Sequence, residues 1–223
     1  MAVATRPQRL STSVADALRE EILKGIITPG CWLRQEELAE RFGVSRMPIR
    51  QAMRQLAAEG LVDLDRQWGG QVTQLAVEEI EELFEMRALL EGAAVAQAVR
   101  LVTSGDVSRM KSELDLMRAS TDTDAFLQHN ARFHGVLLEI SGRKHMRYAV
   151  DRIRVNVERY LRVYIWLIGQ LAQRNDDHRE ILDAVTARDA AKARKLTERH
   201  IRQTGELVAK ALRHAQGHVM HAL

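Results

Sequence analysis

The chain has 223 residues, of which 46% are hydrophobic, 28% charged and only 4% aromatic, so we expect a mainly α-helical protein without large sheets. The net charge of +3 is compatible with a polyanionic partner but does not indicate one. Cys31 is the only cysteine, which excludes an internal disulfide and favours a cytoplasmic location. No apolar run approaches the roughly 20 residues that cross a bilayer, so we expect no membrane partner.

The N-terminal third begins with polar residues and then shows helical periodicity. Residues 1–12 lack the apolar core of a secretory signal and are expected to form a flexible arm. Apolar residues near a 3.6-residue repeat predict a helix over 14–25, with Ser13 as its N-cap. A second, short helix is predicted over 36–42, after a break rich in proline and glycine.

A third helix follows a tight turn at Gly43 and Val44. Ser45 is expected to cap this helix, and Gly60 to end it. Its apolar residues share one face, which must pack on the first two helices; they are Ile49, Ala52, Met53 and Leu56.

The next segment has the pattern of a hairpin. Extended pieces are predicted over 61–64 and 71–75, on either side of a polar turn over 65–70. Three helices followed by a hairpin are the order of a winged helix-turn-helix. We therefore predict such a domain over residues 13–76.

The third helix carries arginines on one side. Arg46, Arg50 and Arg54 follow one another at intervals of four residues, so their side chains share a face. Arginine can hold a phosphate or bind the O6 and N7 edge of guanine, as a helix in the major groove requires. The alternative is that they form surface ion pairs with nearby carboxylates, namely Glu37, Glu40 or Glu59.

Four segments of this region together resemble the GntR family of bacterial regulators; they read LREEILKG, PG, EELAERFGVSRMPIRQAMRQLAAEGLV and WGGQV. The resemblance implies a homodimer that reads an inverted repeat in double-stranded DNA. It also implies DNA contacts by five residues of the third helix and by the wing tip; these are Ser45, Arg46, Met47, Pro48, Arg50 and Gly69. Met47 stands where threonine is commoner. Glu36 stands where many relatives have a basic residue, and Arg34 is the expected substitute.

Residues 77–215 show long helical periodicities with five breaks, which predict six helices, and residues 216–223 are expected to form a tail. Three segments resemble the helical ligand-binding domain called FCD; they read ELFEMRALLEGAAVAQA, NARFHGVLLEISG and HREILDAVTARDAAKARKLTERHI. The predicted fold is thus a winged helix-turn-helix followed by an all-helical bundle.

His134, His178 and His200 lie on three different predicted helices of this bundle. Each alone is more often an ordinary surface or core histidine than a metal ligand. Asn130 precedes His134 by four residues and shares its helix face. Three imidazoles and an oxygen donor suit zinc, nickel or another divalent transition ion. The FCD resemblance implies such a site at these four residues, with Asn130 in place of the usual aspartate, so we expect weaker metal binding.

Arg87 lies in the segment EMRALLE and has two interpretations. It can form an ion pair with Glu91, four residues on, or serve as the cation for an effector carboxylate, which the FCD resemblance favours. The sequence therefore predicts a metabolite-responsive transcription regulator, a repressor released by a small carboxylate, rather than an enzyme. The alternatives are a metal-dependent hydrolase that uses the three histidines, and a DNA-binding protein without an effector.

Overall fold

The computed structural model describes residues 6–65, 69–168 and 175–220, and the chain divides into two compact units. The first unit comprises Met1–Leu75 together with Arg154–Arg159, and the second comprises Ala76–Ile153 and Tyr160–Leu223. Most described residues are helical, which confirms the predicted fold class. In the described part of the chain, none of the helices is both long and apolar enough to cross a membrane.

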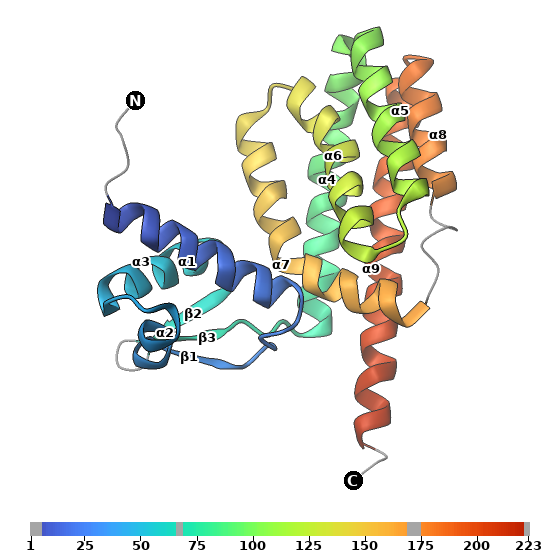
Figure 1. Ribbon diagram of the computed structural model, residues 1–223. Coiled ribbons are helices and arrows are strands. Elements are labelled where there is room, and N and C mark those ends of the chain that lie inside the picture. The colour runs from blue at the N-terminus through green and yellow to red at the C-terminus, as the bar shows by residue number, and fades with distance from the viewer. Residues whose placement is uncertain (1–5, 66–68, 169–174, 221–223) are drawn as a thin grey trace. The chain divides into compact units, whose positions relative to one another are not determined.

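The first unit is a winged helix-turn-helix. Its elements are α1 (Arg6–Leu23), β1 (Trp32–Arg34), α2 (Gln35–Phe42), α3 (Arg46–Ala58), β2 (Val62–Asp65) and β3 (Gly69–Val72). The strands form an antiparallel sheet in the order β1-β3-β2, beside the three helices (Figure 1). The core of this unit includes the apolar face predicted for α3 and the inner faces of α1 and the sheet.

The start of α1 differs from the prediction. The helix begins at Arg6 rather than near Val14, so residues 6–12 belong to a helix and not to a flexible arm. Pro7 does not interrupt it, because the amides of a first turn have no acceptor within the helix. Ser13 consequently lies inside the helix and is not its N-cap. Residues 1–5 lie outside the described residues.

A third strand was also absent from the prediction. Trp32–Arg34 pair with Gly69–Gln71, so the sheet has one strand more than the predicted hairpin. The turn between α2 and α3 is as predicted: Gly43 has φ +62°, and its N–H bonds to carbonyls in the last turn of α2. Ser45 occupies the N-cap position of α3, but its side chain makes no capping hydrogen bond.

The described part of the chain after Ala76 contains six helices, as the sequence predicts. They are α4 (Val77–Leu101), α5 (Ser104–Ala119), α6 (Thr123–Ile140), α7 (Lys144–Ile168), α8 (Asn175–Thr186) and α9 (Ala190–Met220). All of them belong to the second unit except Arg154–Arg159 of α7. Helix α4 packs along α9 and against α6, while α8 packs against α9 and α5. Helix α9 continues to Met220, so residues 216–220 are helical rather than part of a tail. This packing places α6, α8 and α9 close enough to share a site.

Candidate functional site

The outer face of α3 carries the predicted arginines. Arg46, Arg50 and Arg54 are all exposed. Arg46 lies 2.7 Å from a carboxylate oxygen of Glu36, but both side chains are more than 60% exposed, so this ion pair is weak. Among the described residues, Arg50 and Arg54 form no ion pair. Their guanidinium groups are therefore available to a partner.

A groove lies beside these arginines, between α3 and the hairpin. It has a volume of about 310 Å³ and is lined by Gln35, Arg50, Met53, Arg54, Leu64, Asp65 and Gly69. The alternative, ion pairs of the α3 arginines with Glu37, Glu40 or Glu59, is not found in the part of the chain that the structure describes. Glu59 instead binds Arg19 of α1, and Glu37 lies 3.5 Å from Arg34. Within the described ranges, none of these three carboxylates forms an ion pair with Arg46, Arg50 or Arg54.

Two of the residues predicted to contact DNA are not on the surface. Pro48 is buried, because its ring belongs to the inner face of α3. Gly69 was expected at the exposed wing tip, but it is buried in β3, where it pairs with Arg34 and Asp65. A Cβ at Gly69 would lie 2.3 Å from the Leu33 carbonyl oxygen, so this glycine allows the strands to approach. The wing tip itself, residues 66–68, lies outside the described residues.

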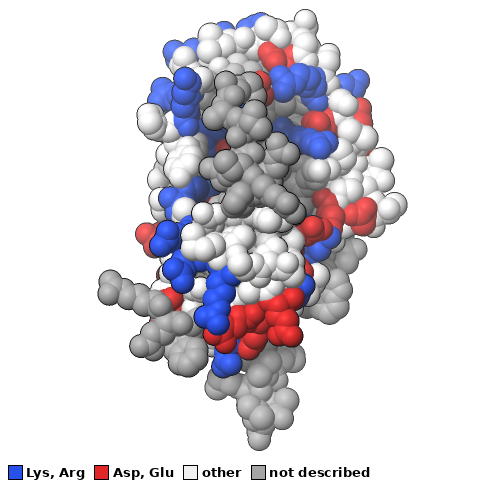
Figure 2. Space-filling model, turned by 60° about the vertical axis from the view of Figure 1, so that its left-hand side comes forward, with Lys and Arg blue, Asp and Glu red and all other residues white. Residues whose placement is uncertain are grey.

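The remaining predicted contacts are accessible. Ser45 and Arg34 are exposed, and the side chain of Met47 is 58% exposed. On the face shown in Figure 2, basic and acidic side chains both lie in several groups. Local arginines, rather than the overall charge, are the feature suited to DNA.

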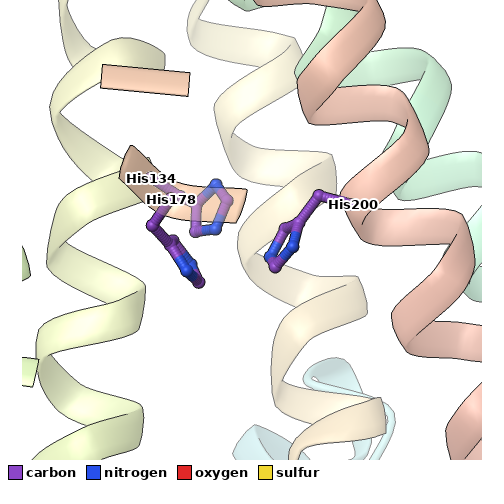
Figure 3. A group of neighbouring side chains, drawn as sticks. All are labelled: His134, His178 and His200. Atoms are coloured by element: carbon purple, nitrogen blue, oxygen red, sulfur yellow. The ribbon is translucent and has the colours of Figure 1, made fainter. Parts of the chain in front are cut away.

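The three predicted histidines meet inside the second unit. His134 of α6, His178 of α8 and His200 of α9 approach one another from three helices (Figure 3), and one ring nitrogen of each lies within 4.8 Å of the others. All three are buried. The rings of His178 and His200 are the closest pair, with centroids 4.4 Å apart. The prediction that the bundle brings them together is confirmed.

Each histidine has a polar neighbour within the bundle. The amide nitrogen of Asn130 lies 2.9 Å from Nε2 of His178, and since that nitrogen can only donate, the imidazole nitrogen is an acceptor. Nδ1 of His200 lies 3.1 Å from a carboxylate oxygen of Asp177, and this hydrogen bond lowers the pKa of Asp177. Nδ1 of His134 lies 3.5 Å from Oε2 of Glu91.

These neighbours fit the requirements of a metal site. Metal-ligating histidines usually direct their second nitrogen to a carboxylate, which fixes the tautomer and leaves the other nitrogen for the ion. His200 has that arrangement with Asp177, and Nδ1 of His134 lies 3.5 Å from a carboxylate oxygen of Glu91. A half-turn of the Asn130 amide would present its oxygen where its nitrogen now lies. The donor set, three neutral imidazoles and an amide oxygen, suits a divalent transition ion.

Arg87 lies beside the histidines and is also ion-paired. It lines the same cavity as Asn130 and the three histidines, together with Phe126, Leu161, Ile201 and Thr204. Its Nε donates to Oε1 of Glu91 at 2.9 Å, and both residues are buried. The ion pair with Glu91 is therefore present and Arg87 also lines the cavity, while its role toward an effector carboxylate stays a prediction. The cavity volume of about 20 Å³ has room for one ion or water molecule.

Sequence reasoning missed one contributor to this site and undervalued another. Asp177 was not considered, although it directly precedes His178 in the first turn of α8. Glu91 was considered only as an ion-pair partner of Arg87, whereas it is 1% exposed and also contacts His134. Its spacing of four from Arg87 was the available signal for the first contact, but nothing local pointed to the second.

Comparisons with known proteins agree with this architecture. Residues 10–72 match the family described as bacterial regulatory proteins, gntR family, and residues 82–203 match the FCD domain. The chain is 28% identical to the transcriptional repressor GlaR of Escherichia coli, over 87% of this chain and 94% of GlaR. It is 27% identical to the gluconate operon transcriptional repressor of Bacillus subtilis, over 76% of this chain and 70% of that protein. The structure of E. coli McbR/YncC has the same fold, with a TM-score of 0.78 at 20% identity, over 94% of this chain and 99% of that one.

Proposed function

The chain belongs to the GntR family of bacterial regulatory proteins and carries an FCD domain, and from this premise we propose that it represses its target genes until a small carboxylate binds in the FCD domain beside a divalent metal ion. The protein is a DNA-binding transcriptional regulator. The observation that carries the proposal is that three buried histidines and a buried arginine line a single cavity.

The metal part of the proposal is supported by the donor set. His134, His178 and His200 would hold the ion, with Asn130 as a fourth, neutral donor. When bound, a divalent transition ion supplies a Lewis-acidic coordination position that a carboxylate oxygen can occupy. The protein itself keeps the three imidazoles buried. It also places a carboxylate beside Nδ1 of two of them, His134 and His200.

The carboxylate part is supported by Arg87 and by the relatives. A buried guanidinium in the cavity can form a paired, charge-assisted contact with a carboxylate. One relative is named for the gluconate operon, and gluconate is a sugar acid. The class of small organic acids therefore suits this site better than neutral or cationic metabolites.

The size of the cavity favours a mechanism that involves movement. A volume of about 20 Å³ does not admit an organic acid, so side chains or helices around the histidines must shift when the acid binds. Such a shift alters the population of conformations, and in a homodimer it would change the spacing of the two winged domains on DNA. DNA affinity would then fall.

The proposal is tested by thermal unfolding of the full chain, purified without an affinity tag. We expect Zn²⁺ or Ni²⁺ to raise the melting temperature, and at least one acid from a panel of small carboxylates to raise it further, because a ligand that binds only the native state stabilises it. An acid that acts only when the metal is present supports the shared site. If the metal has no effect, the metal site is wrong; if no acid acts, the effector-free alternative is favoured.

The hydrolase alternative loses its support once the family is known. Both matched families and the relatives are transcriptional regulators, so the chain is not expected to be an enzyme. The exposed arginines of α3 and the wing also have no part in hydrolysis. The histidine cluster is therefore assigned to sensing.

A further inference from the structure

Glu91 is a carboxylate that contacts two functional groups at once. It lies on α4 and is 1% exposed. Its Oε1 accepts a hydrogen bond from Nε of Arg87 at 2.9 Å and lies 2.9 Å from Nη2 of the same arginine, and its Oε2 lies 3.5 Å from Nδ1 of His134. Arg87 and His134 are themselves only 6% and 3% exposed. One buried carboxylate thus joins the predicted effector cation to a predicted metal ligand.

The contact between Glu91 and His134 matters because of the charge that a metal ion would bring into the site. The four donors are neutral, so a divalent ion would bring an uncompensated positive charge into a buried region that already contains Arg87. Two carboxylates touch the imidazoles, Glu91 at His134 and Asp177 at His200. The Glu91 side chain is 2% exposed and that of Asp177 is 38% exposed, so water screens the charge of Glu91 far less.

We infer that Glu91 is a positioning residue that stabilises the metal ion through His134 and competes with the acidic effector for Arg87. From 3.5 Å, its charge favours the tautomer of His134 that is protonated on Nδ1 and leaves Nε2 for the ion, and it compensates for the neutral Asn130. As the partner of Arg87, it must be displaced, wholly or partly, when an effector carboxylate binds that arginine. The inference rests on the function proposed above.

The two roles predict effects of opposite sign. In Glu91→Gln, the side chain keeps its size and an oxygen that can face His134 but carries no charge. We expect the affinity for Zn²⁺, measured by competition with a chelator, to fall about 10- to 100-fold, as is usual when a partner of a metal ligand is changed. At saturating Zn²⁺ we expect acetate, used as the probe carboxylate, to bind several-fold more tightly, because Arg87 no longer has a competing anion.

Three further variants separate charge from damage to the fold. Arg87→Gln breaks the same ion pair but keeps the carboxylate, so it should bind Zn²⁺ at least as tightly as the wild type and acetate more weakly. Glu85→Gln removes an exposed carboxylate of the same helix, which pairs with Arg202, and should change neither affinity. If Glu91→Gln does not fold, the double variant Arg87→Gln/Glu91→Gln, in which neither member of the ion pair is charged, should bind Zn²⁺ more weakly than Arg87→Gln alone.

The outcomes distinguish this inference from the proposal beneath it. A Glu91→Gln protein that binds Zn²⁺ as tightly as the wild type overturns the role of Glu91. So does a loss of both Zn²⁺ and acetate affinity, because a purely structural residue would weaken both. If the wild-type protein itself fails to bind Zn²⁺, the metal site of the proposed function is wrong, and the inference about Glu91 falls with it.

Discussion

Replacing His178 by alanine is expected to abolish tight binding of a divalent metal ion. His178 is 1% exposed, its ring contacts those of both other histidines, and its Nε2 lies beside Asn130. Changes in the partners of metal ligands alone cost about 10- to 100-fold in affinity, so loss of a ligand should cost more than about 100-fold. Metal analysis of dialysed protein and competition with a chelator measure this directly.

His129 offers a matched control on α6. Its Nδ1 lies 2.7 Å from Glu113, and it does not belong to the cluster of three. His129→Ala should therefore retain the metal content of the wild type, while His178→Ala should lose it. A His178→Ala protein that keeps a full complement of metal would remove this histidine from the site.

Replacing Arg50 by alanine is expected to weaken operator binding by about 1–3 kcal/mol, which is roughly 5- to 150-fold, and to relax base choice. Arg50 is exposed on α3, lines the groove beside the hairpin and forms no ion pair among the described residues. Its donors are therefore free to read a base edge or hold a phosphate. Fluorescence anisotropy at fixed salt, on an operator selected with the wild-type protein and on a scrambled duplex, measures both effects.

Arg118 provides a control variant, because its replacement by alanine removes the same single positive charge as Arg50→Ala. It is exposed near the end of α5, so Arg118→Ala removes one positive charge from the second unit and leaves α3 unchanged. We expect that variant to bind the operator as the wild type does. Equal losses in both variants would mean that overall charge, and not the position of Arg50, determines affinity.

The fold followed from sequence wherever periodicity was long or turn residues were specific. The third helix and the turn at Gly43 were predicted because an apolar stripe and a left-handed glycine are local signals. Strand β1 was missed because three residues are too few to show alternation, and its pairing depends on Gly69–Gln71, far along the chain. The start of α1 was missed because the segment before Val14 is polar and contains Pro7.

The site was predictable to the extent that its residue types are distinctive. The resemblance to the FCD domain implied a metal site at three histidines on separate predicted helices, and packing then had to bring them together, which no local pattern encodes. The burial of Gly69 and the second contact of Glu91 could not be foreseen, since both depend on the direction of a neighbour from another element. Residues that read DNA are recognised by type and exposure; those that support a site are recognised only by their contacts.

The central claim is that the histidine-lined cavity controls DNA binding, and one titration tests it most directly. Operator affinity is measured with metal-loaded protein, with and without the carboxylate that raises its melting temperature. We expect this acid to lower operator affinity about 5- to 150-fold in the wild type and to have little effect in Arg87→Gln. An acid that binds the metal-loaded protein yet leaves operator affinity unchanged would contradict it.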